Sequence, residues 1–248
     1  MRVEQLYTKN SHSWMMLGQD QERRSEVIDT NQYLIRNNDR GLLLDPGGGE
    51  IFSVVAAEFS KHFDLANVEA VFVSHQDPDV ISSLALWSQT NPDLIVYMPK
   101  IWVKFIAHFG VKLENIRPIP DEGGFITLGG HDLEVIPAHY LHSSGNLSLY
   151  DPKAKILFSG DVGSALLPDD YAGSFVTDFE QHTQYMEYFH RRWMPSNTAK
   201  MRWIAQVRKR DVEMLCPQHG AIFKGEDVDK FLNWFENLDL GSGWSGVR

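Results

Sequence analysis

Two kinds of hydrophobic pattern alternate along this chain. Short runs of apolar and β-branched residues predict strands, and longer stretches with apolar residues three and four positions apart predict helices. The predicted strands cover residues 3–7, 13–17, 25–28, 32–37, 41–45, 68–73, 95–98, 125–128, 132–137, 146–150, 155–159 and 212–216. The predicted helices cover residues 51–62, 80–89, 100–109, 180–209 with a break at Pro195, and 228–238.

The order of these elements is a β-meander, an α/β segment, a second β-meander and a second α/β segment. Because each β-rich half is followed by helices, the order favours two sheets packed face to face with helices on the outside. The chain contains no low-complexity segment, linker or repeat of obvious period. We therefore expect one domain that spans residues 1–248.

The apolar run at residues 68–73 ends in a His-x-Asp-x-Asp triplet. The run is apolar on both faces, which is typical of a buried strand, and Pro78 ends its ladder because proline has no N–H to donate. His75, Asp77 and Asp79 therefore lie at the carboxyl end of a core strand, where α/β sheets place their sites. A solvated acidic loop is the alternative, but groups this close favour a metal ion between them.

Three further predicted strands are each followed by a loop with one candidate ligand, namely His142, Asp161 and His219. Each of these residues also has an ordinary structural interpretation. His142 could cap the turn that follows it, Asp161 could form a turn before Gly163, and His219 could be a loop or core histidine. The case for a metal site therefore depends on the four segments as a set.

Composition excludes several classes of partner. The chain has 248 residues, of which 43% are hydrophobic, and its net charge is −10. That charge argues against nucleic acid and anionic membranes as partners. No apolar run is long enough to span a bilayer, and the first residues lack the apolar core of a signal peptide. The single cysteine, Cys216, excludes an internal disulfide framework and fits a reducing compartment, so we expect a cytoplasmic protein.

The order and spacing of these residues resemble the metallo-β-lactamase superfamily, and within it the diiron domain of flavodiiron proteins. Residues 31–35 and 42–45 are similar to the first hairpin of that family, and residues 157–161 and 216–220 to its last two site motifs. The resemblance implies an αββα sandwich of the α/β class, with a dinuclear metal site at one edge of the two sheets. The implied metal ligands are His75, Asp77, Asp79, His142, Asp161 and His219.

By this resemblance, His75, Asp77 and His142 would hold one metal, Asp79 and His219 the other, and Asp161 would bridge them. Three imidazoles and three carboxylates favour two iron ions over two zinc ions, because carboxylates suit harder ions and stabilise the ferric state. Asp77 stands where flavodiiron proteins have glutamate, and Val80 stands where the family has a further histidine. Coordination positions on the second metal would therefore stay open.

The chain ends at Arg248 without the flavodoxin-like extension that carries flavin in the reductases. It is thus similar to the oxygen-binding diiron proteins that serve in sensing. The resemblance implies that it binds dioxygen or another small diatomic gas, works with a redox or signalling partner, and forms a homodimer. Two other hypotheses stay open: a dizinc hydrolase of an ester, thioester, lactone or phosphodiester, and an interaction module that has lost its metal.

Other residues near these segments have weaker candidate roles. His139, His182 and His190 are candidate hydrogen-bond partners of the ligands, and the sequence indicates no role for His12, His62, His108 and His131. The aromatic residues expected to shape the pocket, or else to belong to the core, are Tyr140, Tyr171, Phe175, Phe179, Tyr188 and Phe189.

Overall fold

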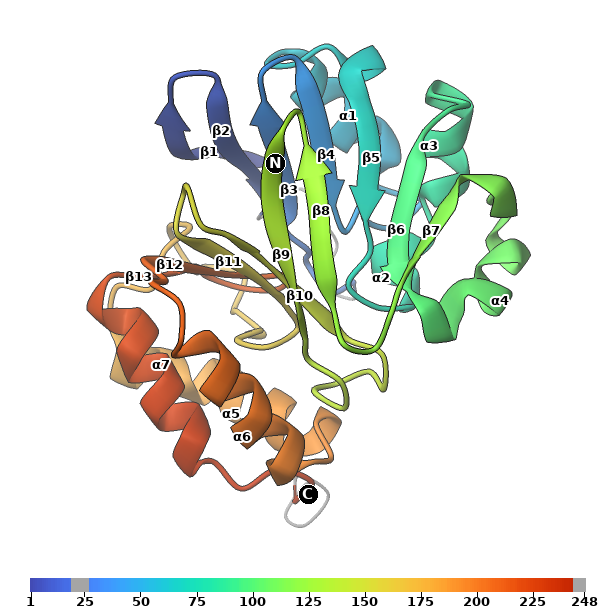
Figure 1. Cartoon of the computed structure of the whole chain (residues 1–248). Helices are drawn as coiled ribbons and strands as arrows, with labels where there is room; N and C mark the ends of the chain where they lie inside the picture. Colours follow the sequence, from blue (N-terminus) through green and yellow to red (C-terminus); the bar gives the residue numbers. More distant parts are fainter. Residues whose placement is uncertain (19–26, 243–248) are drawn as a thin grey trace.

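A computed structural model describes residues 1–18 and 27–242, and its strands form two sheets (Figure 1). We call them sheet A, with seven strands in the order β1 to β7, and sheet B, with six strands in the order β13-β12-β11-β10-β9-β8. The strands of sheet A are β1 (Arg2–Lys9), β2 (His12–Gly18), β3 (Gln32–Asn37), β4 (Arg40–Leu44), β5 (Val68–Phe72), β6 (Ile95–Pro99) and β7 (Ile116–Ile119). The strands of sheet B are β8 (Gly124–Leu128), β9 (His131–Pro137), β10 (Leu147–Asp151), β11 (Ile156–Gly160), β12 (Met214–Pro217) and β13 (Phe223–Lys224).

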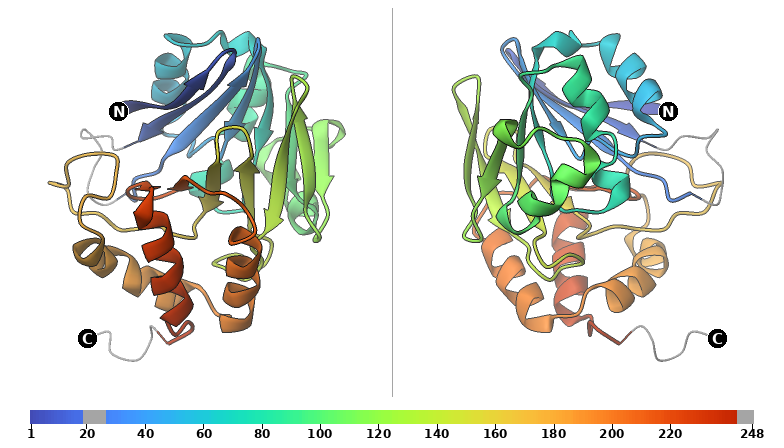
Figure 2. Two further views of the ribbon diagram at one scale, coloured as in Figure 1. Left: turned by 60° about the vertical axis from the view of Figure 1, so that its left-hand side comes forward. Right: turned by 90° about the vertical axis from the view of Figure 1, so that its right-hand side faces the viewer.

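Helices lie outside both sheets, so the described chain has four layers (Figure 2). The α-helices that follow strands of sheet A are α1 (Phe52–Ser60), α2 (Pro78–Ile81), α3 (Leu84–Thr90) and α4 (Val103–Ile106). Those that follow strands of sheet B are α5 (Phe179–Trp193), α6 (Asn197–Val207) and α7 (Glu226–Asn237). The helices α5 and α6 are capped by Asp178 and Ser196, whose side chains accept hydrogen bonds from backbone N–H groups of the first turn.

Three hydrophobic cores separate the four layers. The core between the sheets contains Phe72 and Phe158. Neighbouring positions on the same strands face outward, because side chains alternate along a strand. Val71 packs with the helices over sheet A, and Leu157 packs with α5, α6 and α7 over sheet B. The predicted αββα sandwich is confirmed, and the strands are apolar on both faces because both faces are covered.

Parallel strands bring the candidate ligand loops to one edge. The strand β5 runs parallel to β4 and β6, and β11 runs parallel to β12. The carboxyl ends of β5, β11 and β12 each lead into a loop with candidate ligands. A hydrogen bond of 3.1 Å from the backbone N–H of Leu147 to the Ser74 carbonyl joins β10 of sheet B to the end of β5 in sheet A. The two sheets are therefore tied together at the edge where the loops meet.

Several sequence predictions are confirmed and others are wrong. The strand predicted at 32–37 matches β3, and the helical stretch 180–209 breaks near Pro195 as expected. The predicted strand at 25–28 is wrong for residues 27–28, which are exposed and not in a strand, while residues 25–26 lie outside the described part. The sequence patterns missed β7, because Arg117 and Pro118 interrupt its apolar pattern, and the two-residue strand β13.

Within the described residues, no helix has both the length and the apolar character needed to cross a bilayer.

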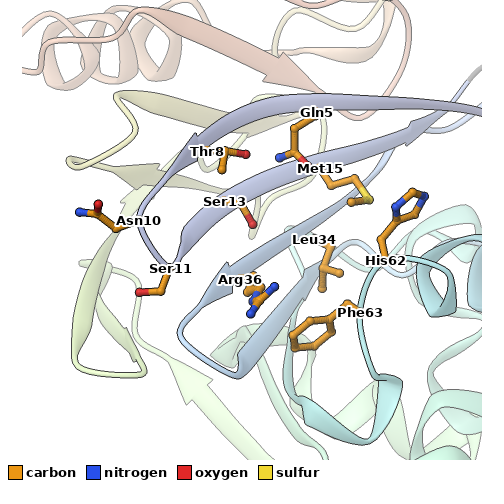
Figure 3. A pocket seen from close by; sticks show the side chains of 10 residues that line it. All are labelled: Gln5, Thr8, Asn10, Ser11, Ser13, Met15, Leu34, Arg36, His62 and Phe63. Carbon is orange, nitrogen blue, oxygen red and sulfur yellow. The ribbon is translucent and has the colours of Figure 1, made fainter.

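A hollow of about 240 Å³ is lined by residues of β1, β2 and β3, including Arg36, and by His62 and Phe63 (Figure 3). Its described lining includes none of the six candidate ligands, so it is separate from the site considered next.

Candidate metal centre

The side chains of all six candidate ligands lie together at one edge of the two sheets. Within this group, His75 Nε2 lies 3.3 Å from Asp161 Oδ2 and 3.6 Å from Asp77 Oδ2. Atoms that bind one metal ion at about 2.1 Å lie roughly 3–3.5 Å apart, whereas an N–H···O hydrogen bond is usually about 2.9 Å long. Most of the nitrogen–oxygen separations in the group therefore have the spacing of ligands around a cation rather than the spacing of a hydrogen bond.

His75 follows β5, and its ring is held by the residues behind it. The Ser74 hydroxyl donates to Asp45 Oδ2 at 2.5 Å, so it can accept a hydrogen bond from Nδ1–H of His75 at 2.8 Å. The backbone N–H of Ser74 donates to the other Asp45 oxygen at 2.7 Å. This chain of hydrogen bonds keeps a proton on Nδ1 and leaves Nε2 to face Asp77 and Asp161.

His142 lies on the loop after β9, which has a tightly folded backbone. Tyr140 and His142 both have positive φ angles, of 64° and 76°, and the Tyr140 N–H donates to the Ser143 carbonyl at 2.8 Å. Such strain is characteristic of functional loops. The loop places His142 Nε2 2.7 Å from Asp77 Oδ2 and 3.4 Å from Asp161 Oδ2.

Asp161 divides the centre into two halves. Its side chain is 2% exposed, and it follows Gly160, whose φ of 58° turns the chain at the end of β11. The Oδ2 atom faces His75 and His142, and the Oδ1 atom lies 3.4 Å from His219 Nε2. One carboxylate oxygen thus faces each half, which is the arrangement needed to bridge two metal ions.

The second half contains Asp79 and His219. His219 Nδ1 donates to the Asp29 carbonyl at 2.7 Å, which leaves Nε2 to face Asp79 Oδ2 at 3.4 Å. Val80 adds no ligand there, because its aliphatic side chain has no donor atom; it is fully buried and packs into the core between sheet A and helices α1 and α3. The second half therefore has fewer protein ligands than the first.

The charges of the centre depend on one another. Burial lowers the pKa of His75, but the neighbouring Asp161 charge and the contact with Asp77 outweigh it and raise the pKa to about 9. Burial raises the pKa of Asp161, but the charges of His75 and His219 hold it well below the ordinary range. Without a metal, the neighbouring carboxylates therefore favour the protonated forms of the His75 and His219 imidazoles. A divalent cation would replace these protons.

Aromatic rings cover the His142 side of the centre. The Phe189 ring stacks on His142 with centroids 5.9 Å apart, and the Trp193 ring lies 5.5 Å from His142 although the tryptophan is 51% exposed. Of the aromatic residues singled out from the sequence, Phe189 has this role. Tyr171 and Phe179 pack against the core under α5, and Tyr140 is exposed.

Several of the remaining histidines do not have the roles expected from the sequence. His139 bonds to the Asp121 carbonyl, and His190 accepts from the Gly163 N–H and donates to the Met186 carbonyl. No hydrogen bond links His139, His182 or His190 to the six candidate ligands within the described residues. The histidines at 12 and 131, to which the sequence patterns gave no role, instead meet Asp151.

Sequence reasoning missed the residues that support the ligands. Gln76 donates to Asp77 Oδ1 at 2.7 Å, and Gln218 donates to Asp79 Oδ2 at 3.2 Å. Both glutamines could have been identified from the sequence, because each lies directly beside a candidate ligand. Trp193 was missed as well, although it lies one helical turn after Phe189, which the sequence did indicate.

Comparison with known proteins identifies the family of this chain. Residues 28–220 match the family described as "ODP family beta lactamase". The chain belongs to this ODP family. Its fold matches the chemotaxis sensor ODP from T. denticola in the apo state, with 40% identity, a TM-score of 0.89 and coverage of 98% of this chain and 97% of that one. It also matches a peroxy diiron species of chemotaxis sensor ODP, with 39% identity, a TM-score of 0.87 and 98% of both chains covered.

More distant relatives share the fold. A mutant of the flavodiiron protein from Thermotoga maritima is 22% identical with a TM-score of 0.79, over 95% of this chain and 60% of that one. The chain spans about half the length of a curated relative, an uncharacterized protein of Methanocaldococcus jannaschii, with 26% identity over 84% of this chain and 53% of the relative. Its resemblance to flavodiiron and ODP proteins is thus confirmed.

Proposed function

We propose that this chain is a non-haem diiron protein that binds dioxygen. The observation that carries the proposal is the position of Asp161, whose two oxygens face the imidazoles of two separate half-sites. A single cation would need only one of these oxygens. The ODP relative that was solved as a peroxy diiron species supports the choice of metal and ligand.

The donor set fits two irons. In the proposed assignment, His75, Asp77 and His142 hold one ion, Asp79 and His219 hold the other, and Asp161 bridges them. Carboxylates suit harder ions, and their negative charge stabilises the ferric state. When reduced iron is bound, the pair supplies the affinity for dioxygen.

The remaining residues prepare this site. The Ser74 hydroxyl and the Asp29 carbonyl hold the Nδ1 protons of His75 and His219, so that both Nε2 atoms face the centre. Phe189 and Trp193 limit the access of water beside His142. Because Val80 lies in the core, the second half keeps positions that no described ligand fills.

The partners follow from the same proposal. We expect dioxygen, or another small diatomic gas, to be the ligand, and a separate redox or signalling protein to supply electrons or read the bound state. The sensor role in chemotaxis of the T. denticola relative makes signalling the favoured outcome. A homodimer, a cytoplasmic location and a single domain spanning residues 1–248 stay predictions; the buried, unpaired Cys216 fits a reducing compartment.

The test is anaerobic loading of the full chain with Fe²⁺, followed by metal analysis and exposure to air. We expect two irons per chain and a new visible absorption band in air. The proposal is wrong if the chain retains fewer than two irons or shows no new band. Turnover of an ester and thioester panel by the zinc-loaded chain, lost on Asp79→Ala, would favour the hydrolase instead.

A further inference from the structure

Gln76 lies between the candidate ligands His75 and Asp77 in the sequence, and its side chain links two of the loops that carry candidate ligands. Its side-chain Nε2 donates to Asp77 Oδ1 at 2.7 Å. Its side-chain Oε1 accepts from the Ser143 hydroxyl at 2.6 Å. Ser143 follows His142, so this chain of hydrogen bonds joins the loop after β5 to the loop after β9.

The orientation of the Gln76 amide is set by its two partners. Asp77 Oδ1 belongs to a carboxylate, which only accepts hydrogen bonds when ionised, so the amide must present N–H to it. The Ser143 hydroxyl accepts from the Gly145 N–H at 3.2 Å and is therefore free to donate its proton to Gln76 Oε1. If the amide were turned over, its oxygen would face the Asp77 carboxylate and the hydrogen bond between them would be lost, whereas the Ser143 hydroxyl can either donate or accept.

The two oxygens of Asp77 consequently have different surroundings. Oδ1 is occupied by the Gln76 amide, whereas Oδ2 faces both imidazoles of the first half, at 2.7 Å from His142 Nε2 and 3.6 Å from His75 Nε2. A metal ion placed between the two imidazoles would meet Oδ2. To bind through Oδ1 as well, the carboxylate would have to turn toward the ion, and the hydrogen bond from the Gln76 amide to Oδ1 restrains that turn.

We propose that Gln76 is a positioning residue that limits Asp77 to coordination through Oδ2 alone. This inference rests on the proposed function, since it needs a metal in the first half of the centre. A metal held by His75, Asp77 and His142 would then keep one position that a carboxylate bound through both oxygens would fill. Gln76 also fixes how far the short Asp77 side chain reaches toward the metal.

The test uses Co²⁺ as the probe, because the intensity of its visible absorption falls as its coordination number rises. The variant Gln76→Met keeps the length of the side chain but has no amide. We expect the Co²⁺-loaded variant to absorb more weakly per metal than the wild type, because Asp77 gains a second bound oxygen. Competition with a chelator should show a loss of Co²⁺ affinity of about 10–100-fold, as is usual when a residue that orients a ligand is removed.

Two further variants distinguish positioning from general loss of structure. Ser143→Ala removes only the anchor of the amide, so a smaller change of the Co²⁺ spectrum in the same direction is expected. Gln5→Met is the matched control, because the Gln5 amide donates to the Tyr7 and Trp14 carbonyls, at 2.8 and 2.7 Å, and contacts no candidate ligand. Its Co²⁺ spectrum and affinity should be those of the wild type.

The outcomes separate the two proposals. If the wild type binds two Co²⁺ ions and Gln76→Met has the same spectrum per bound ion, Asp77 does not depend on Gln76 and the positioning role is wrong, while the metal centre stands. If Gln5→Met changes the spectrum as much as Gln76→Met, the positioning role is also wrong. If the wild type itself binds no Co²⁺ pair, the proposed function fails and the positioning role fails with it.

Discussion

Two clusters in this chain are built from the same residue types, histidine and aspartate, but differ in the spacing of their atoms. One is the candidate metal centre. The other joins the two sheets and consists of His12 on β2, His131 on β9 and Asp151 on β10; we call it the inter-sheet cluster. In the inter-sheet cluster the imidazole nitrogens lie 2.6 and 2.8 Å from Asp151 oxygens. These are the lengths of hydrogen bonds, and both are shorter than the separations around Asp161.

The two central carboxylates explain the difference. Asp151 Oδ2 accepts from His12 and from the Trp14 indole, and Oδ1 accepts from His131 and from the backbone N–H groups of Lys153 and Ala154. Its capacity to accept is used up. Asp161 faces three imidazoles at 3.3–3.4 Å, and its hydrogen bond from the Ser164 hydroxyl is long, at 3.4 Å. The available lone pairs make Asp161 a candidate metal ligand, whereas the fully used lone pairs of Asp151 make it a structural anchor.

The largest expected effect is on metal content. Asp161→Ala removes the oxygens that face both half-sites, so we expect the two iron ions per chain to be lost on desalting. Metal analysis of anaerobically loaded protein checks this, with circular dichroism to show that the variant is folded. Retention of both irons by a folded Asp161→Ala chain would mean that this carboxylate is not the bridge.

The reciprocal variant should change stability instead. Asp151→Ala leaves the buried His12 imidazole, the partly buried His131 imidazole and the Trp14 indole N–H without this partner, which costs about 3–5 kcal/mol in the free energy of unfolding. Urea denaturation measures the cost, and metal analysis should still find two irons per chain. If Asp151→Ala lost its metal while its stability was unchanged, the two clusters would have exchanged roles and the comparison would be wrong.

The sequence predicted one of these clusters and not the other, for a physical reason. The candidate ligands lie on segments that follow strands, and the apolar runs before His75, Asp161 and His219 already place those three at one edge of the sheets. The inter-sheet cluster has no local signal. His12 and His131 meet only because β2 of one sheet faces β9 of the other. The sequence pattern of neither strand predicts that packing.

The same limit applies to the supporting residues and to the irregular elements. Gln76 and Gln218 sit beside ligands, but which oxygen each one contacts depends on the fold of two loops. Strand β7 contains Arg117 and Pro118 and has an exposed middle, so its place at the edge of sheet A is set by pairing with β6 rather than by its own pattern. Long-range packing thus determines the contacts of these glutamines and the position of β7, which hydrophobic periodicity does not predict.

Removal of the metal should lower the melting temperature of the chain and so test the difference between the two clusters. Metal that binds the folded chain stabilises it by about 3–4 kcal/mol when its concentration is 100–1,000 times the dissociation constant. For a chain of this size, that corresponds to a melting temperature about 5–15 °C lower after chelation. Asp151→Ala should show the same drop from its own lower starting point, and Asp161→Ala should show none. A chelator that leaves the wild-type melting temperature unchanged would argue against a bound metal pair.

The smallest expected effect is the acid dependence of the inter-sheet cluster. Burial raises the pKa of Asp151, but hydrogen bonds from His12 and Trp14 outweigh it and hold the pKa below its ordinary value of 3.8. An acid with a lowered pKa contributes stability above its unfolded pKa and loses it as the pH falls. The difference in melting temperature between wild type and Asp151→Asn should therefore be constant above about pH 5 and shrink below about pH 4.

The measurement is made on chelator-treated protein, where the effect of Asp151 is separate from that of His75. The pKa of His75 is raised to about 9, so its contribution to stability is lost as the pH rises instead. A difference that stays constant down to about pH 3 would show that the Asp151 charge adds nothing to the cluster.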